Sequence, residues 1–434
     1  MRLAGWRATA GVLGLFALAV VVFFSDVILG DRVLLTADPA AYQPWRAYSA
    51  AGAAGSAPGR GYRTDSILTY LPRQTELARS IAAGRLPLWN PYILAGAPFL
   101  ADPQSRVLYP VSLALAPVGA EKAMGYDVAL HVLLAMTGMY LYLRRISCGA
   151  PEAILGAFAY GFSSFFFTRM GHPTFVAAAA WIPFLFYGFE RARSAGRGAA
   201  VALAALLALG YLSGFPQVFI FGALGVVVYG FYLSLDCGRP PEGLSSLAAG
   251  PGRRARLAAT ARILGVGGGL AVLVVGVQLV PFVEYLRNSV GLGISLDAMK
   301  QAYLWKPVML LRTVFPNFFG NPVEGTNWVP LVERGVHPYN VGFMVYCGVG
   351  TLVLAAGGLA FAPASARLRS LLVILAAAVA VGTSGLALGL AYRALPLLRY
   401  SQIDRISVVA CFALAALGAK SLALFRSCED GRLR

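Results

Sequence analysis

Ten long apolar runs constrain the fold of this chain more than any other feature of its sequence. A helix of about 20 apolar residues spans the hydrocarbon core of a bilayer. Only 13% of the residues are charged, about half the share that is typical of soluble domains. The sequence therefore predicts an all-α, polytopic integral membrane protein, with one transmembrane domain over residues 1–434 and about ten transmembrane helices. The runs cover residues 8–29, 123–143, 151–168, 174–190, 198–213, 217–235, 263–284, 341–362, 369–390 and 406–425.

The basic residues predict the orientation of these helices. Arg2 and Arg7 precede the first run, and no signal-peptidase-like site follows it, so we expect an uncleaved first helix with a cytoplasmic N-terminus. Cytoplasmic loops are enriched in Lys and Arg. With ten helices, every predicted cytoplasmic connection carries Arg, as this rule expects. The prediction is a multi-pass cell-membrane protein with both termini in the cytoplasm.

The net charge of +17 does not indicate nucleic-acid binding. In a membrane protein, basic residues accumulate in cytoplasmic loops and near anionic lipid headgroups. We find no Lys- and Arg-rich run with interleaved aromatic residues on a soluble segment, so membrane lipids are the expected partners and nucleic acid is not.

Metal and disulfide chemistry have weak support in the sequence. The five Cys residues are scattered singly, and none forms a CxxC pair, so disulfides and Cys-based metal sites are not expected. The three His residues show no HExxH-like spacing, which argues against a His-based zinc site. They are His131, His172 and His337.

Three segments between the runs stand out by composition. Residues 31–122 and 286–340 form two long loops on the predicted extracytoplasmic side, and both are rich in Trp, Tyr, Pro and Asn. Loops of such length are usually functional or disordered, and these are too aromatic to be disordered. Residues 236–260 are rich in Gly, Pro, Ser and Arg and read as a basic cytoplasmic linker. Any chemistry is therefore expected outside.

The first loop contains a predicted interfacial helix. Pro72 favours the first turn of a helix, and Gly84 favours the position just past its end. Trp89, Tyr92 and Tyr109 are residue types of the membrane interface. We expect a short amphipathic helix on the membrane surface. Its apolar face would carry Leu71, Ala78, Ile81 and Ala82, and its polar face Arg73, Glu76 and Arg79.

Asp65, just before this helix, allows two interpretations. It could cap the helix together with Thr64, since both residue types favour that role. It could also accept a proton from a hydroxyl group or ligate a divalent cation. The spacing does not separate the two. Asp102, which precedes a proline, is typical of a turn.

Several of these segments resemble the bacterial YfhO-like membrane protein family. The most specific stretch is AGRLPLWNPYILAGAPFLADPQSRVLYP (83–110), and Asp65 with TYLP (69–72) precedes it. SGFPQ (213–217) is similar to a Gly-His-Pro-Gln turn of the family, with Phe215 in the place of His. Thr69 stands where relatives commonly carry Gln. Further matches are VPFVEYLRNSV (280–290), FPNFFGNP (315–322), YNVGFMVYCGVGTLVLA (339–355) and LPLLRYSQIDRISVV (395–409).

The resemblance implies a fold and an activity. The family is similar to GT-C-type glycosyltransferases, in which interfacial helices of the first outer loop carry the key acidic residue. It implies transfer of a sugar from a polyprenyl-phosphate-linked donor to a cell-envelope acceptor, whether glycolipid, polymer or protein. By motif position Asp65 would be catalytic. Asp38 is the rival, because it lies nearer the first helix, where such enzymes often place their acid.

A departing lipid phosphate needs cations or a metal ion, and Arg suits phosphate through bidentate contacts. Each cation could instead be an interfacial anchor, and no cofactor is certain, although a divalent cation could serve. Two other functions stay open: a polytopic transporter or lipid flippase, and a non-catalytic envelope-assembly protein. The candidate donor-phosphate ligands are Arg287, Lys306, Arg312 and Arg405.

Overall fold

The computed structural model describes residues 2–36, 64–93, 95–195, 197–236, 252–289, 293–320, 326, 328, 344–361 and 365–429. The predicted rival acid Asp38 lies outside these described residues, as does His337.

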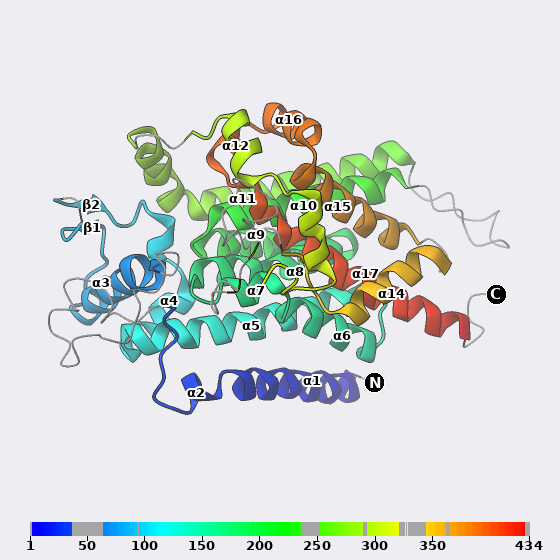
Figure 1. The fold of residues 1–434 in the computed structure, drawn as a ribbon, viewed down its shortest axis with the longest axis horizontal. Helices are drawn as coiled ribbons and strands as arrows, with labels where there is room; N and C mark the ends of the chain where they lie inside the picture. The colour runs from blue at the N-terminus through cyan, green and yellow to red at the C-terminus, as the bar shows by residue number, and fades with distance from the viewer. Residues whose placement is uncertain are drawn as a thin grey trace.

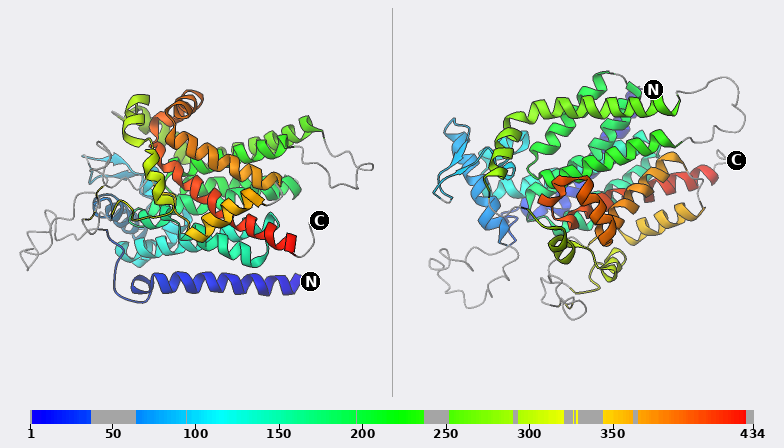
Figure 2. Two further views of the ribbon diagram at one scale, coloured as in Figure 1. Left: turned by 45° about the vertical axis from the view of Figure 1, so that its right-hand side comes forward. Right: turned by 90° about the horizontal axis from the view of Figure 1, so that it is seen from above.

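The described chain is a bundle of long helices, as expected for the all-α class (Figure 1). Each of the ten apolar runs contains a helix, and further views show these helices lying side by side along one common direction (Figure 2). The long elements are α1 (Arg2–Phe23), α5 (Ala120–Arg145), α6 (Ala150–Gly161), α8 (Pro173–Ala195), α9 (Arg197–Leu212), α10 (Pro216–Leu235), α11 (Arg253–Arg287), α14 (Val349–Phe361), α15 (Ala366–Thr383) and α17 (Ser407–Glu429).

Among the described residues, five segments are long and apolar enough to cross a membrane. A window of 18 residues with few charges matches the hydrocarbon thickness of a bilayer. These segments support the membrane class that the composition predicts. They are Ala120–Arg145, Pro216–Leu235, Arg253–Arg287, Ala366–Thr383 and Ile403–Ser427.

Two of the predicted single spans are broken helices. The run 151–168 divides into α6 and α7 (Ser164–Thr168). The helix is interrupted between these two elements, which allows Ser164 to pair with Tyr346. The Ser164 amide donates to the Tyr346 carbonyl oxygen, and the Tyr346 amide donates to the Ser164 hydroxyl oxygen, both at 2.9 Å. The run 369–390 divides into α15 and α16 (Gly385–Ala394), because Ser384 is extended and its side chain accepts a hydrogen bond from the Ala387 amide.

The core lies around α17, the most enclosed of the long helices. Every residue of α17 from Val408 to Leu417 is buried. Small residues allow its neighbours to approach closely: a Cβ at Gly418 would lie 2.9 Å from the Thr351 carbonyl oxygen on α14. On its other side, Phe412 packs on Phe186 of α8 with ring centroids 4.3 Å apart.

Helix α11, in contrast, lies at the edge of the bundle. It packs mainly on α9 and α10 and leaves large apolar side chains uncovered, including Leu273, Val277 and Val280. A contiguous apolar surface of this kind is unusual on a soluble protein and is typical of a membrane-facing helix.

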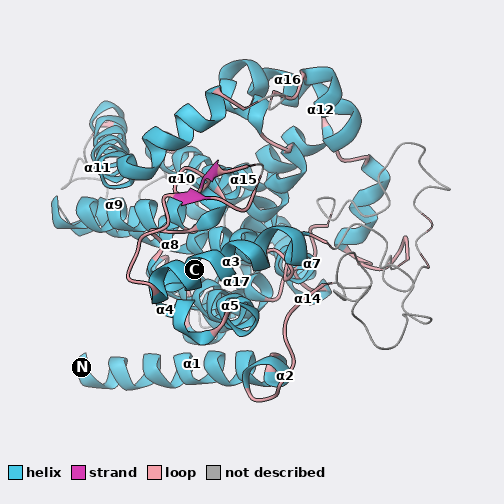
Figure 3. Ribbon diagram, turned by 90° about the vertical axis from the view of Figure 1, so that its left-hand side faces the viewer, coloured by secondary structure: helices cyan, strands magenta, loops and turns pink. Residues whose placement is uncertain are grey.

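Short elements of the first loop cover one end of the bundle (Figure 3). Pro72 and Gly84 bracket α3 as predicted, since Gly84 has φ +67° and its amide bonds to the Ile81 carbonyl. These elements are a π-helical turn η3 (Ser66–Tyr70), α3 (Leu71–Ala82), the strand pair β1 (Trp89–Asn90) and β2 (Ala97–Pro98), η4 (Pro103–Ser105), α4 (Pro110–Leu115) and η5 (Ala116–Val118).

Two predictions for the first loop are wrong: the buried face of the predicted helix and the position of Tyr109. The buried residues of α3 are Glu76, Leu77 and Ser80, because α3 packs against α5 and η5. Glu76 is buried there with a hydrogen bond of 2.9 Å from Ser80. Tyr109, expected at the interface, is fully buried.

Candidate functional site at one end of the bundle

A cavity of about 680 Å³ lies where several connections between helices converge. Its lining comes from η3, η4, the α7–α8 turn, the start of α10, α12 (Leu296–Tyr303) and η9 (Ile403–Ile406). All of these segments fall on the predicted extracytoplasmic side, and we call this end of the bundle the cavity end. The lining residues are Asp65, Thr69, Tyr70, Gln104, Arg169, His172, Phe175, Phe215, Ala302, Tyr303, Gln402, Asp404 and Arg405.

Asp65 lies at the rim of this cavity. Its Oδ2 is 3.2 Å from His172 Nε2, and 58% of its side chain is exposed. It makes no side-chain capping hydrogen bond to η3, so the capping interpretation is wrong. The hydrogen bond with His172 is the main cause that lowers the pKa of Asp65 below 3.8. A carboxylate that stays ionised and reachable can accept a proton from a bound hydroxyl group.

Arg405, a predicted phosphate ligand, lines the same cavity but is already held by neighbours. Its guanidinium donates to the side-chain carbonyl oxygens of Gln217 and Gln402. It also lies 4.8 Å and 4.9 Å from the ring centroids of Phe175 and Phe215, a favourable cation–π geometry. Phe215 and Phe175 therefore form an aromatic platform beneath Arg405.

The other three predicted phosphate ligands are not among the residues that line the cavity. Arg287 is exposed at the end of α11, and Lys306 is half-buried before η6 (Pro307–Thr313). Arg312 is buried beside Phe319, with 5.4 Å between guanidinium carbon and ring centroid. The structure brings Asp65 and Arg405 together and leaves these three elsewhere.

Two charged residues of the cavity were not predicted from the sequence as site residues. Arg169 lies in the short α7–α8 turn and is only 4% exposed, and Asp404 lies in η9 and is 6% exposed. Burial lowers the pKa of Arg169 to about 10. A signal for Arg169 did exist, because an Arg in a short turn on the predicted extracytoplasmic side departs from the positive-inside pattern.

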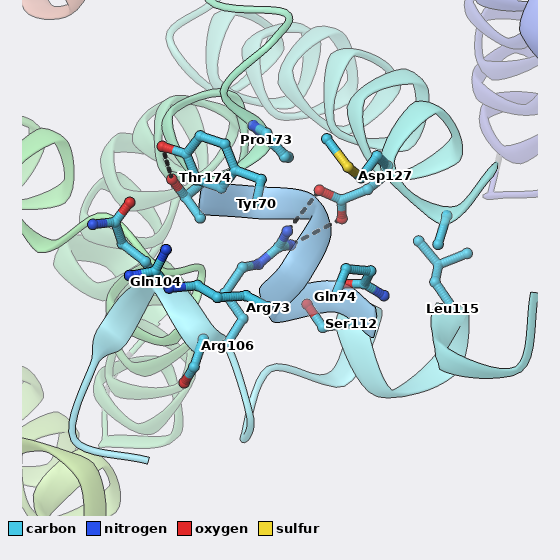
Figure 4. Close-up of a pocket in the computed structure, with 13 residues that line it drawn as sticks. Tyr70, Arg73, Gln74, Gln104, Arg106, Ser112, Leu115, Asp127, Pro173 and Thr174 are labelled. Atoms are coloured by element: carbon cyan, nitrogen blue, oxygen red, sulfur yellow. Dashed lines mark hydrogen bonds and ion pairs between the residues drawn. The ribbon is translucent and has the colours of Figure 1, made fainter. Parts of the chain in front are cut away.

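A buried polar network fixes the first loop beside the cavity (Figure 4). Arg106 forms two hydrogen bonds with the Asp127 carboxylate on α5, at 2.6 Å and 2.9 Å. Tyr109 accepts from Trp181 at 2.9 Å and lies 2.6 Å from His131 Nε2. Bidentate charge-assisted pairs of this kind give both strength and orientation. The loop that carries Asp65 is thereby anchored to α5 and α8.

A small pocket of about 20 Å³ lies within this network. Tyr70 and Gln104 line both this pocket and the larger cavity. Burial raises the pKa of Tyr70 to about 12, so its hydroxyl stays protonated near neutral pH. Asp102 forms the expected turn: it accepts from the Gln104 amide at 3.0 Å and pairs with Arg73 at 2.7 Å.

No group of three or more His, Cys, Asp or Glu side chains that could hold a metal ion is found in the described part of the chain. Asp65 and His172 are a single neighbouring pair, so the divalent cation that the sequence allowed stays a prediction.

Comparison of the chain with protein-family models, with curated proteins and with solved structures gives no match.

Proposed function

We propose that this protein is a membrane glycosyltransferase that moves a sugar from a polyprenyl-phosphate-linked donor to a cell-envelope acceptor. The observation that carries the proposal is the cavity of about 680 Å³, which has a carboxylate, Asp65, at its rim and a guanidinium, Arg405, in its wall. The remaining parts of the proposal are a GT-C-like arrangement of ten spans and an extracytoplasmic position for the cavity end.

The reaction needs a base and a site for a departing anion. The acceptor hydroxyl gives its proton to Asp65 while its oxygen bonds to the anomeric carbon of the sugar. The bond from that carbon to the phosphate oxygen breaks, and the lipid phosphate leaves with the electron pair. Arg405 stabilises the charge that develops on the phosphate.

The cavity has room for these groups. Ligand pockets commonly have volumes of about 300–1,000 Å³, so 680 Å³ suits a sugar with its phosphate. The isoprenoid chain would lie along the apolar bundle surface, to which exposed Leu and Val side chains contribute.

The test is transfer of label from a panel of radiolabelled polyprenyl-phosphate sugars in membranes that contain the protein. We expect label in an acceptor with the wild type, and a loss of about 100-fold or more in Asp65→Asn, because general bases contribute that much. Asp297→Asn is the matched control, since Asp297 is an 88% exposed acid on α12 outside the cavity lining.

Unchanged transfer in Asp65→Asn would refute the assignment of the base. Absence of transfer with every donor, from a folded protein, would refute the proposed function and favour a transporter, a flippase or an assembly protein.

A further inference from the structure

Arg169 and Asp404 line the cavity as oppositely charged neighbours that do not pair. Asp404 is the charge that attracts Arg169 most strongly, yet no salt bridge of either residue occurs among the described residues. Arg169 Nε and Nη1 have no hydrogen-bond partner, and neither has Asp404 Oδ1. Burial of an unpartnered charged group costs several kcal/mol in general, so their unpaired state calls for an explanation.

A neighbouring arginine shows that a buried arginine near the cavity can be paired. Arg106 is also buried near the cavity end, but Asp127 binds it through two hydrogen bonds of 2.6 Å and 2.9 Å. Arg169 instead faces the rings of Phe165 and Phe175, with its guanidinium carbon 4.7 Å and 5.3 Å from their centroids. The rings hold the cation in position without using its N–H groups in ordinary hydrogen bonds.

The two side chains offer complementary chemistry to a ligand. A guanidinium has only donors, and an ionised carboxylate has only acceptors. An anionic group suits the N–H groups of Arg169, and a hydroxyl suits the free oxygen of Asp404. One ligand that carries both groups would satisfy both residues at once.

We propose that Arg169 and Asp404 form a two-point binding subsite, in which Arg169 donates to an anionic group and Asp404 accepts from a hydroxyl on the same ligand. This inference deepens the proposed function and rests on it for the identity of the ligand, a phosphodiester with sugar hydroxyls. In this arrangement Asp65 accepts the proton of the reacting acceptor hydroxyl, while Asp404 accepts a hydrogen bond from a hydroxyl of the donor sugar.

The test compares two probes that carry the same single charge. Citronellyl phosphoglucose has sugar hydroxyls, and citronellyl methyl phosphate has none. Their binding to the purified protein in lipid nanodiscs is measured by isothermal titration calorimetry. We expect the wild type to bind the sugar probe about tenfold more tightly, because hydrogen bonds to charged groups have that magnitude.

Two variants separate the two points of contact. Arg169→Gln is expected to weaken both probes by about tenfold or more, since it removes the charge that binds the anion. Asp404→Asn is expected to weaken only the sugar probe and so to abolish the difference between the probes. Arg393→Gln, at an exposed position of α16, is the control and should change neither affinity.

Equal affinity of the wild type for the two probes would overturn the role of Asp404, and this comparison needs no variant. Wild-type affinity of Arg169→Gln for both probes would overturn the role of Arg169. The expected binding pattern without any sugar transfer would leave the subsite standing and refute the transferase. Sugar transfer together with unchanged binding of the probes in both variants would refute the subsite and leave the transferase standing.

Discussion

The two ends of the helix bundle differ in how their buried charged groups are paired. One end pairs its buried carboxylates with arginines, whereas the other holds two buried charged residues, Arg169 and Asp404, that make no ion pair with any described residue, beside the paired Arg106 and Asp127.

Helices α8 and α10 begin at the cavity and end at the opposite side, where three carboxylates meet arginines; we call that side the ion-pair end. There Glu190 accepts two hydrogen bonds of 3.1 Å from Arg367 and one of 2.6 Å from Tyr229. Asp236 and Arg369 form a second bidentate pair at 2.8 Å.

At the cavity end, Arg169 and Asp404 are buried but stay unpaired. A paired buried charge stabilises a particular packing, whereas an unpaired one lowers stability and is retained where a ligand needs it. The contrast indicates that the Glu190 pairs stabilise the packing of the helices and that the buried, unpaired Arg169 lowers stability. Substitutions of Glu190 and of Arg169 should therefore have opposite effects on stability.

The largest effect is expected at the ion-pair end. Glu190→Gln removes the charge that accepts from Arg367 and Tyr229, at a position that is only 2% exposed. We expect the free energy of unfolding to fall by about 2 kcal/mol, in the range for hydrogen bonds to charged groups. Thermal unfolding in nanodiscs measures it. A melting temperature equal to that of the Asp297→Asn control would contradict the structural role of this end.

A smaller effect of opposite sign is expected at the cavity end. Arg169→Met replaces an unpaired buried cation with an apolar side chain of similar length, which should raise the free energy of unfolding by about 1 kcal/mol. Ligand binding should be lost at the same time. The matched substitution Arg106→Met should instead lower the free energy of unfolding, because it leaves the buried Asp127 carboxylate without its guanidinium partner. If both variants lose stability equally, the distinction between the two arginines fails.

The smallest effect concerns pH and Asp65. The folded-state pKa of Asp65 is lowered, mainly by its hydrogen bond with His172. Its stabilising contribution is therefore complete above the ordinary pKa of 3.8 and is lost as pH falls through the lower, folded value. The contribution is small, since 58% of the side chain is exposed.

This prediction is checked with melting temperatures of wild type and Asp65→Asn at several pH values. The difference between them should stay constant down to pH 3.8 and shrink below it. In a His172→Gln background, which lacks the main cause of the lowered pKa of Asp65, the difference should be smaller and should depend less on pH. A difference that grows on acidification would show that the pKa of Asp65 is raised instead.

The helices could be predicted from sequence because their signal is local. Each apolar run gives its own helix, and Pro72 with Gly84 gives the bounds of α3. The breaks at Ser163 and Ser384 were missed, since a hydropathy average over 18 residues hides one extended residue. Glu76 was placed on the wrong face of α3 because its burial depends on α5, which the local pattern does not report.

The site could be predicted only in part, for the same physical reason. Asp65 was a candidate because of its place before the predicted helix of the first loop, and Arg405 because Arg suits phosphate. Arg169 and Asp404 became candidates only through their burial in the cavity wall and the atoms that they leave without a hydrogen-bond partner. The absence of a partner is a property of the folded packing and has no pattern in the sequence.

The cavity draws its walls from segments between Asp65 in η3 and Arg405 in η9, and this has a consequence for biosynthesis. Helices enter the membrane in the order of their translation, so the pocket stays open on one side until the segment just before α17 has emerged from the ribosome. Until then Arg169 lacks Asp404, its attracting neighbour, and α17 has not yet filled the centre of the bundle. The cavity wall and the core of the bundle therefore become complete with the same, last part of the described chain.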